Sequence, residues 1–257
     1  MKKLATLIGI NYVGTKSELG GCINDTKLLV EKLVNDFNFN THNIQLLLEE
    51  TATKKNILES IERLVEELEP GDLGVLTYSG HGTQTADLPP VNEEDMLDEA
   101  IVPINAVQEL DNLIRDDEIN EILGKLKNDV RFIVIFDSCH SATGTREIGK
   151  TRMFPPSIAV QEINRIRTDI LTLDNEKPKR HPLSGMNHIL LAGCKANELS
   201  FDDGTNGYFT KELVKSMKKG ISYQELYEST YKAVVERSNN RQNPQIEGRE
   251  LTRKIFE

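Results

Sequence analysis

The apolar positions of the chain fall into short continuous runs that alternate with longer amphipathic stretches. Short apolar runs occur at residues 4–10, 44–48, 73–78, 132–136 and 188–192. Runs of this length are typical of strands that are covered on both faces of a sheet. Between them lie stretches with helical spacing. Helices are expected from Asn24 or Asp25 onward and over residues 53–69, 116–126, 207–218 and 223–237.

Alternating strands and helices imply right-handed crossover connections and a mostly parallel, doubly wound α/β sheet. Further short strands are expected near residues 100–103 and 244–246. The polar stretch 83–98, which contains paired prolines and an acidic patch, is expected to be a loop.

The alternating pattern lapses over about residues 144–185, where prolines interrupt the chain and no strong apolar stripe is present. We therefore expect a single domain in three parts. These are a larger part, residues 1–145, a basic linker, residues 146–185, and a smaller part, residues 186–257.

The composition narrows the class of protein. The chain has 257 residues, of which 38% are hydrophobic and 28% charged, as in a globular α/β domain. We expect no membrane span and no secretion signal, because no apolar run is long enough. Three cysteines without a CxxC pair argue against a disulfide scaffold or a structural zinc site, so a cytoplasmic location is expected. The net charge of −10 argues against a nucleic-acid partner and leaves room for a basic substrate.

The linker departs from this acidic balance. Residues 146–182 hold eight basic and five acidic side chains, a charge of +3, so the rest of the chain carries −13. One interpretation is a solvated insertion. The other is a basic segment that binds in an acidic cleft of the same protein.

Two strand ends carry reactive side chains. His81 follows the third predicted strand, and Cys139 follows the strand at 132–136. Active sites in open parallel sheets form at the carboxyl ends of the strands, so these groups would meet if the strands are neighbours. A thiolate that attacks an amide and an imidazole that protonates the leaving amine are the parts of a thiol protease. The backbone N–H groups of Gly82 and Cys139 could bind the oxyanion.

Each residue alone also has a structural explanation. A cysteine after a strand usually packs in the core, and a histidine in a glycine turn is often incidental. Cys22 and Cys194 fit the packing explanation better, because each adjoins apolar sequence. His81 and Cys139 together, at matching strand ends, favour a catalytic pair.

Several motifs in order resemble the metacaspase group of the caspase-like cysteine peptidases, in the single-domain form typical of prokaryotes. The two that carry the reactive residues are 78–82 (YSGHG) and 137–141 (DSCHS). The others are 21–25 (GCIND), 98–103 (DEAIVP), 115–118 (RDDE), 190–194 (LLAGC), 206–210 (NGYFT) and 242–245 (QNPQ). Together they run along nearly the whole chain except the linker.

The resemblance implies a caspase–haemoglobinase fold with a six-stranded sheet and a catalytic dyad of His81 and Cys139. It also implies a substrate pocket formed by four residues, Cys22, Asp25, Ser79 and Asp137. Two carboxylates in a pocket favour arginine or lysine before the cut bond. The alternative role of Asp25, as a helix cap, is compatible with this one. The implied partners are proteins or peptides that carry Arg or Lys at the cut site, and the resemblance implies a monomer.

Calcium is an activator that the resemblance implies, although the chemistry itself requires no cofactor. The family's ligands correspond to Asp98, Asp116 and Asp117, which offer hard oxygen donors. A fourth family aspartate corresponds to Arg146, and Glu147 beside it could substitute. Acidic residues at a helix N-terminus are also explained by the helix dipole alone, so both explanations stay open.

The leading hypothesis is an endopeptidase that cuts after Arg or Lys and processes its own linker. Basic residues close to Cys139, including Arg152, are expected to be too near to reach back to the pocket. The favoured cut sites are Arg165, Arg167, Lys179 and Arg180. The alternatives are a caspase-like regulatory or scaffold module without turnover, and a protease of narrow specificity in a defence or signalling cascade.

Overall fold

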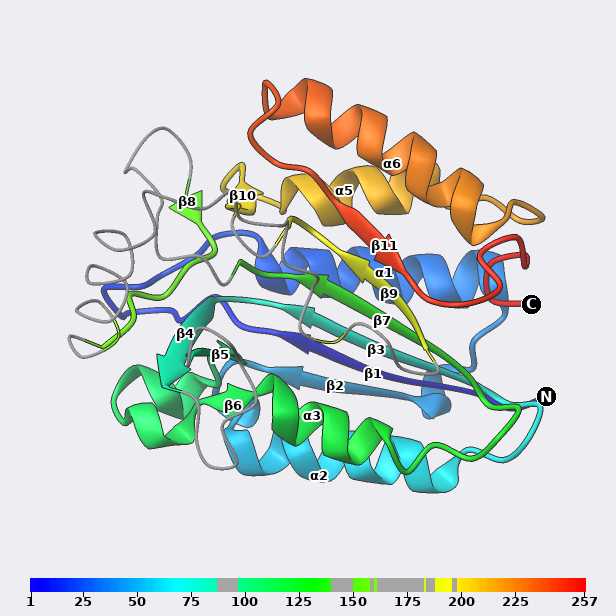
Figure 1. Cartoon of the computed structure of the whole chain (residues 1–257), viewed down its shortest axis with the longest axis horizontal. Helices are drawn as coiled ribbons and strands as arrows, with labels where there is room; N and C mark the ends of the chain where they lie inside the picture. Colours follow the sequence, from blue (N-terminus) through cyan, green and yellow to red (C-terminus); the bar gives the residue numbers. More distant parts are fainter. Residues whose placement is uncertain (87–96, 140–149, 158–159, 161–182, 184–187, 196–197) are drawn as a thin grey trace, which may run out of the picture.

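A six-stranded sheet forms the centre of the molecule (Figure 1). The computed structural model describes residues 1–86, 97–139, 150–157, 160, 183, 188–195 and 198–257. The strand order is β11-β9-β7-β3-β1-β2, and all neighbours are parallel except β11 with β9. The six strands are β1 (Lys3–Gly9), β2 (Ile44–Leu48), β3 (Leu73–Ser79), β7 (Arg131–Asp137), β9 (Ile189–Ala192) and β11 (Gln245–Glu247). The predicted mostly parallel α/β fold is confirmed.

Helices cover both faces of this sheet (Figure 1). One face carries α2 (Lys54–Glu67) and α3 (Asp116–Leu123). The other carries α1 (Cys22–Phe37), α5 (Tyr208–Ser216) and α6 (Tyr223–Arg237). Among the described residues, no helix has both the length and the apolar character needed to cross a membrane.

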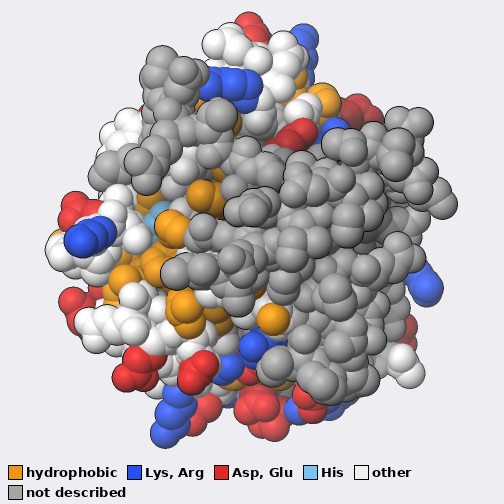
Figure 2. All heavy atoms as spheres, turned by 60° about the vertical axis from the view of Figure 1, so that its left-hand side comes forward, with side chains coloured by type: hydrophobic (Ala, Val, Ile, Leu, Met, Phe, Trp, Pro, Cys, Tyr) orange, Lys and Arg blue, Asp and Glu red, His pale blue; other side chains and the backbone are white. Residues whose placement is uncertain are grey.

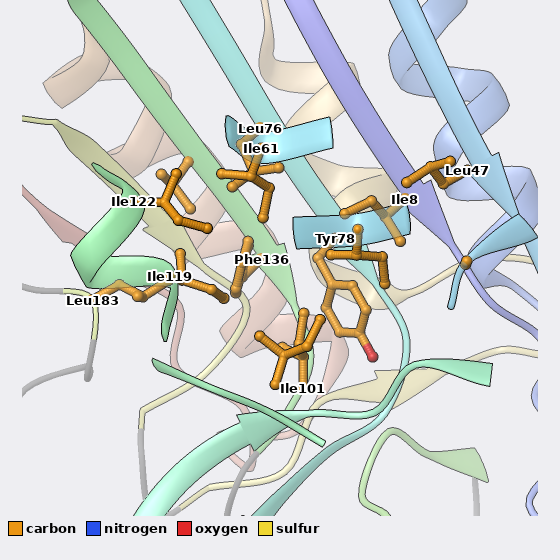
Figure 3. Packing of buried hydrophobic residues seen from close by; sticks show 14 of the residues in the cluster. Ile8, Leu47, Ile61, Leu76, Tyr78, Ile101, Ile119, Ile122, Phe136 and Leu183 are labelled. Carbon is orange, nitrogen blue, oxygen red and sulfur yellow. The ribbon is translucent and has the colours of Figure 1, made fainter. Parts of the chain in front are cut away.

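The alternation of side chains along the strands divides the core into two clusters. Even-numbered positions of the central strands, such as Leu76 and Phe136, pack towards α2 and α3, where Ile61 and Ile122 meet them (Figure 3). Odd-numbered positions, such as Val75, pack towards α1, α5 and α6. The same alternation directs the last residues of β3 and β7, Ser79 and Asp137, to the α1 and α5 face.

Two smaller sheets lie beyond the carboxyl ends of the central strands (Figure 1). The first is antiparallel and consists of β4 (Gly82–Ala86), β5 (Leu97–Ile101) and β6 (Ile114–Arg115). The second joins β8 (Lys150–Thr151) to β10 (Phe201–Asp202). The expectation of a loop throughout residues 83–98 is therefore wrong at both ends, because 83–86 and 97–98 pair as strands. The two strands, on either side of residues 87–96, pair with each other. Local apolar runs do not reveal pairing between segments that are separated in the sequence.

The helix boundaries show where distant residues override local signals. Helix α6 has the predicted bounds, and Thr53 caps α2 as expected by accepting a hydrogen bond from the Asn56 amide. Helix α1 begins at Cys22, earlier than expected. The side chain of Asn11 accepts hydrogen bonds from the Cys22 and Ile23 amides at 2.9 and 3.2 Å, so a residue outside the helix satisfies its first donors.

Candidate active site

The strands that precede the two reactive residues are neighbours in the sheet. Strand β3 pairs with β7 in parallel, and the register places Ser79 opposite Asp137. His81 and Cys139 each follow two residues beyond that pair, so both lie at the same edge of the sheet. Both are buried, with His81 only 3% exposed and Cys139 fully covered.

Backbone and aromatic contacts hold the His81 imidazole in place. Nε2 lies 2.7 Å from the carbonyl oxygen of Ser17, and a carbonyl can only accept, so Nε2 carries the hydrogen. Nδ1 has no hydrogen-bond partner within the described part of the chain and keeps its lone pair available as a base. The Tyr12 ring packs against the imidazole with centroids 4.7 Å apart, and the Tyr12 hydroxyl accepts from the His81 amide.

Burial keeps both reactive groups neutral in this arrangement. Burial lowers the pKa of His81 to about 4 and raises the pKa of the Cys139 thiol to about 12. The pair therefore consists of a thiol and an uncharged imidazole near neutral pH. Nucleophilic attack would then require the thiol to lose its proton as the sulfur approaches the carbonyl carbon.

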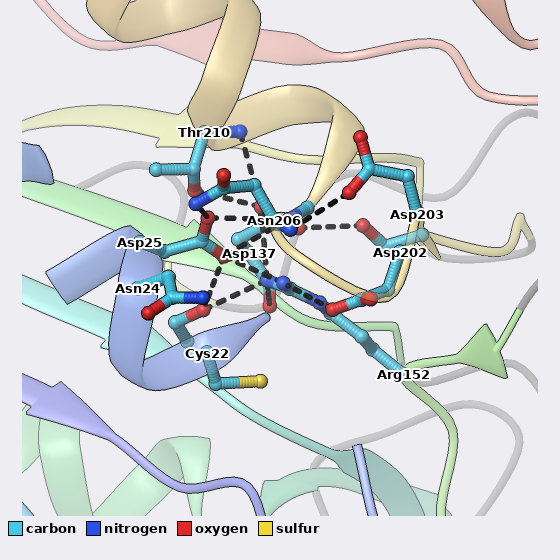
Figure 4. Close-up of polar contacts among 12 residues, drawn as sticks. Cys22, Asn24, Asp25, Asp137, Arg152, Asp202, Asp203, Asn206 and Thr210 are labelled. Atoms are coloured by element: carbon cyan, nitrogen blue, oxygen red, sulfur yellow. Dashed lines mark hydrogen bonds and ion pairs between the residues drawn. The ribbon is translucent and has the colours of Figure 1, made fainter. Parts of the chain in front are cut away.

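The side chain of Arg152 fills a pocket next to this pair and is fully buried (Figure 4). Nη2 lies 2.5 Å from Oδ2 of Asp25 and 3.1 Å from Oδ2 of Asp202, and Nη1 lies 2.9 Å from Oδ2 of Asp137. Nη1 also donates to the Ser79 hydroxyl at 2.8 Å. Burial alone would lower the pKa of Arg152, but these carboxylates raise it well above its usual value.

Neutral donors fix the orientation of the two expected carboxylates. Asp137 accepts from the Ser200 hydroxyl at 2.6 Å and from the Thr210 hydroxyl at 2.7 Å. Asp25 accepts from the Ser79 hydroxyl and the Asn206 amide, both at 2.9 Å. Burial raises the pKa of Asp25 to about 6, and Arg152 beside it acts in the opposite direction. The pocket is thus preorganised for a cation.

Asp202 is a third pocket carboxylate that the sequence analysis missed. It lies at the end of β10, a two-residue strand that exists only because it pairs with β8. No apolar run marks this strand. The available signal was the acidic pair Asp202-Asp203 shortly before the Asn206-Gly207 motif.

Glycine at position 207 lets the backbone approach the bound guanidinium. A Cβ atom at Gly207 would lie 2.6 Å from Nη2 of Arg152 and would also meet Oδ2 of Asp137. The Gly207 amide donates to Asp25 at 3.1 Å. The close approach of the backbone therefore shapes the wall of the pocket and contributes a donor to it.

The backbone of Arg152 is held by hydrogen bonds at the edge of the sheet. Its carbonyl oxygen accepts hydrogen bonds from the amides of Gly82 at 3.0 Å and Cys139 at 3.4 Å, the two groups expected to bind the oxyanion. Its own amide donates to the Ser200 carbonyl at 3.1 Å. Residues just before it pair with β10 as an added strand, a common mode of peptide recognition.

The structure brings together most of the residues named from the sequence. Asp25, Ser79 and Asp137 surround the Arg152 guanidinium, and Cys22 begins α1 beside them. Burial raises the pKa of the Cys22 thiol to about 12. The expectation that Arg152 is too near Cys139 to reach the pocket is wrong, because its guanidinium lies between Asp25 and Asp137. The favoured cut sites, Arg165, Arg167, Lys179 and Arg180, lie outside the described residues.

The proposed calcium ligands lie at the small antiparallel sheet. Asp98 is buried on β5, and its Oδ2 lies 3.3 Å from Nε of Arg115. Asp116 and Asp117 begin α3 directly after that arginine. Within the described residues, no three His, Cys, Asp or Glu side chains are grouped so as to hold a metal ion. Asp98 is paired with Arg115 in this arrangement, so calcium binding at Asp98 would compete with that ion pair. Arg146 and Glu147 lie outside the described residues, and calcium activation stays a prediction.

Comparison with known proteins identifies the class to which this fold and site belong. A family model described as the caspase domain matches residues 2–256. The chain therefore belongs to the caspase domain family, as the motifs suggested.

Several curated relatives within that family are metacaspases. Metacaspase-4 of Arabidopsis thaliana is 40% identical over 146 residues, which cover 55% of this chain and 34% of that protein. Metacaspase-1 of Kluyveromyces lactis is 29% identical over 245 residues, which cover 81% of this chain and 56% of that protein. The chain spans from about a third to just over half of the length of these relatives.

A solved structure supports the fold over the full length. The crystal structure of a protein from Geobacter sulfurreducens matches 100% of this chain and 98% of its own, with a TM-score of 0.70 and 27% sequence identity. The likeness therefore extends over the whole chain.

Proposed function

We propose that this protein is a cysteine endopeptidase that cuts after arginine or lysine, and that it cuts its own chain between Arg152 and Met153. One observation carries the proposal. The Arg152 guanidinium fills the acidic pocket while its carbonyl oxygen accepts from the amides of Gly82 and Cys139. A peptide bond held in this way is presented to the Cys139 thiol in the manner of a substrate.

The proposed reaction proceeds through an acyl-enzyme. The Cys139 sulfur attacks the carbonyl carbon of the basic residue while Nδ1 of His81 takes the thiol proton. The carbonyl oxygen gains negative charge, which the amides of Gly82 and Cys139 stabilise. His81 then gives its proton to the leaving amine, the C–N bond breaks, and a thioester remains. Water, deprotonated by His81, hydrolyses the thioester and restores the thiol.

The pocket supports selection of a basic side chain and favours arginine over lysine. Three carboxylates face one guanidinium, and two of its nitrogens contact different carboxylates. Lysine brings one nitrogen, which cannot reach the same set of acceptors at once. A neutral or acidic side chain would leave three buried carboxylates without a counter-charge.

Tethering explains why the linker occupies the pocket before any other substrate. Only 12 residues separate Arg152 from Cys139 in the sequence, so the effective concentration of this arginine at the pocket is high. While it is bound, it covers the pocket and contributes to the burial of the catalytic pair. The intact chain is then inhibited by its own substrate segment, and a cut after Arg152 is the first step towards an open cleft.

The test is to follow the chain by intact mass, with and without calcium. The wild-type chain should yield two fragments, with the new ends at Arg152 and Met153, and the Cys139→Ala chain should stay whole. Arg152→Ala should abolish this cut, whereas the matched change Arg165→Ala should leave it in place. A wild-type chain that is cut only after Arg165, Arg167, Lys179 or Arg180 would show that the processing site is not Arg152. A chain that stays whole while hydrolysing Arg peptides at full rate would refute self-processing.

A regulatory module without turnover is the second candidate, and the burial of the pair is the observation that favours it. Cys139 is fully covered, and burial raises its thiol pKa to about 12. A labelled arginyl chloromethyl ketone separates the two functions, because only a reactive thiol beside a basic-selective pocket is alkylated. Labelling of wild type but not of Cys139→Ala supports the peptidase. Absence of labelling, together with an uncut chain, supports the regulatory module.

A further inference from the structure

We propose that the cleft also selects the second residue after the cut, and that this position takes an aromatic or large apolar side chain. The inference rests on the proposed function for the position of the cut bond. Phe154 stands at that second position, counting from Met153. The contacts that hold Phe154 come from the backbone of Gly82, the ring of His81 and the core beside them.

Gly82 fixes the register of the segment that follows the cut. Its amide donates to the Arg152 carbonyl at 3.0 Å, and its own carbonyl accepts from the Phe154 amide at 2.8 Å. Gly82 also forms a parallel bridge with Met153, the residue between them. One glycine therefore binds the chain on both sides of the cut bond. Any substrate that uses both hydrogen bonds must place its second residue after the cut where Phe154 lies.

The side chain of Phe154 packs where an apolar group is required. It is partly buried against the hydrophobic cluster between the sheet and α2 and α3. Its ring centroid lies 6.1 Å from that of the His81 imidazole, and the planes of the two rings are inclined at 59°. On the face of the molecule turned forward in Figure 2, hydrophobic side chains gather in one region. A charged group here would lose part of its hydration.

The two positions that follow Phe154 differ from it. Pro155 is exposed, so its side chain offers little to a subsite. Pro156 is buried again, two residues after Phe154, as the alternation of an extended chain requires. Phe154 is therefore the first residue after the cut that combines a fixed backbone with packing against the catalytic histidine. An aromatic ring here also lies near the imidazole that must protonate the leaving amine.

The first experiment measures binding without catalysis. The receptor is the Cys139→Ala, Arg152→Ala chain, which lacks the nucleophile and the tethered arginine. The probe is a fluorescent peptide, KTRMFPP, which copies residues 150–156. Replacing its Phe by Ala or Asp should weaken binding about 10-fold or more, the size expected for loss of an apolar side-chain contact. N-methylation of the Phe amide should weaken binding too, because it removes the bond to Gly82. Replacing the first Pro by Ala is the matched control and should change little.

The outcomes separate this inference from the proposed function. Equal affinity for the Phe, Ala and Asp peptides would overturn the subsite. A clear preference for Phe, combined with a wild-type chain that cuts no peptide, would leave the subsite standing and refute the peptidase.

A second measurement is available if the double variant does not fold. In the single variant Cys139→Ala, hydrogen exchange reports whether the amide of residue 154 stays bonded to Gly82. Adding Phe154→Ala should speed exchange across residues 150–154 at least several-fold, and adding Pro155→Ala should not. Equal exchange in both would overturn the inference, because the side chain of Phe154 would then contribute nothing to binding of the segment.

Discussion

Arg152 and Asp25 form an ion pair in which neither side chain has exposed surface, with Nη2 and Oδ2 2.5 Å apart. The two residues belong to parts of the chain that are 127 positions apart. A buried charge without its partner is costly, so each residue depends on the other. The pair ties Arg152 to the start of α1, and in the proposed function it defines which side chain the pocket accepts.

Replacing Asp25 by Asn tests the role of this pair in substrate selection. Asparagine has nearly the same shape as aspartate but no charge, so the substitution should weaken the binding of a basic side chain. We expect kcat/KM for Arg peptides to fall roughly 30- to 1,000-fold, which corresponds to a loss of about 2–4 kcal/mol of binding free energy in the transition state. Asp36→Asn, on the exposed part of the same helix, is the control and should have little effect. An unchanged kcat/KM in Asp25→Asn would place the selective pocket elsewhere.

The pKa of Asp25 predicts how substrate affinity changes with pH. With a guanidinium in place this pKa is about 6, raised by burial and lowered again by Arg152. Without the guanidinium the carboxyl group keeps its proton to a higher pH, so binding of arginine releases a proton. The KM for Arg peptides should therefore rise as the pH falls from about 8 to about 6. The same titration of Asp25→Asn should be flat. A wild-type KM that does not change over this interval would contradict the assignment.

The nucleophile can be tested against the other cysteines of the chain. Cys139→Ala should fold normally and lose hydrolysis of an Arg-based fluorogenic peptide by several orders of magnitude, because a covalent nucleophile has no substitute. Cys194 is the matched control, since it is also buried and its thiol pKa is also raised by burial. Cys194→Ala should keep its activity. Residual activity of more than a few per cent in Cys139→Ala would exclude it as the nucleophile.

Asp202 is expected to set the preference of the pocket for arginine over lysine. Its Oδ2 contacts Nη2 of Arg152, a nitrogen that Asp25 also contacts, while Asp137 takes Nη1. A lysine ammonium is a single point and gains less from a third carboxylate. Asp202→Asn should therefore lower kcat/KM for Arg peptides more than for Lys peptides. The ratio of the two rates should fall about 10-fold, as for one charge-assisted hydrogen bond. An unchanged ratio would show that Asp202 does not contribute to the preference for arginine over lysine.

The sequence predicted the parts of this molecule that depend on local pattern. Continuous apolar runs located the five parallel strands, and strand ends located His81 and Cys139. Local pattern failed where a partner far along the chain decides the structure. Strand β10 exists through pairing with β8, and the first turn of α1 depends on the side chain of Asn11. Asp202 and the binding of Arg152 were missed for this reason, because Asp202 lies on β10 and Arg152 directly follows β8, two strands that only pairing reveals.

Gly207→Ala tests whether the shape of the pocket, apart from its charge, admits the basic side chain. A Cβ atom at this position would lie 2.6 Å from Nη2 of Arg152, inside any van der Waals contact. The neighbouring carboxylate of Asp137 cannot easily move away, because Ser200 and Thr210 hold it. The variant should therefore exclude the guanidinium, lose most hydrolysis of Arg peptides and leave the linker uncut. Thr205→Ala, an exposed change in the same turn, is the control. Circular dichroism and thermal unfolding would verify that both variants fold. A folded Gly207→Ala chain that still cuts Arg peptides at the wild-type rate would show that the guanidinium of a substrate binds in a different place from that of Arg152.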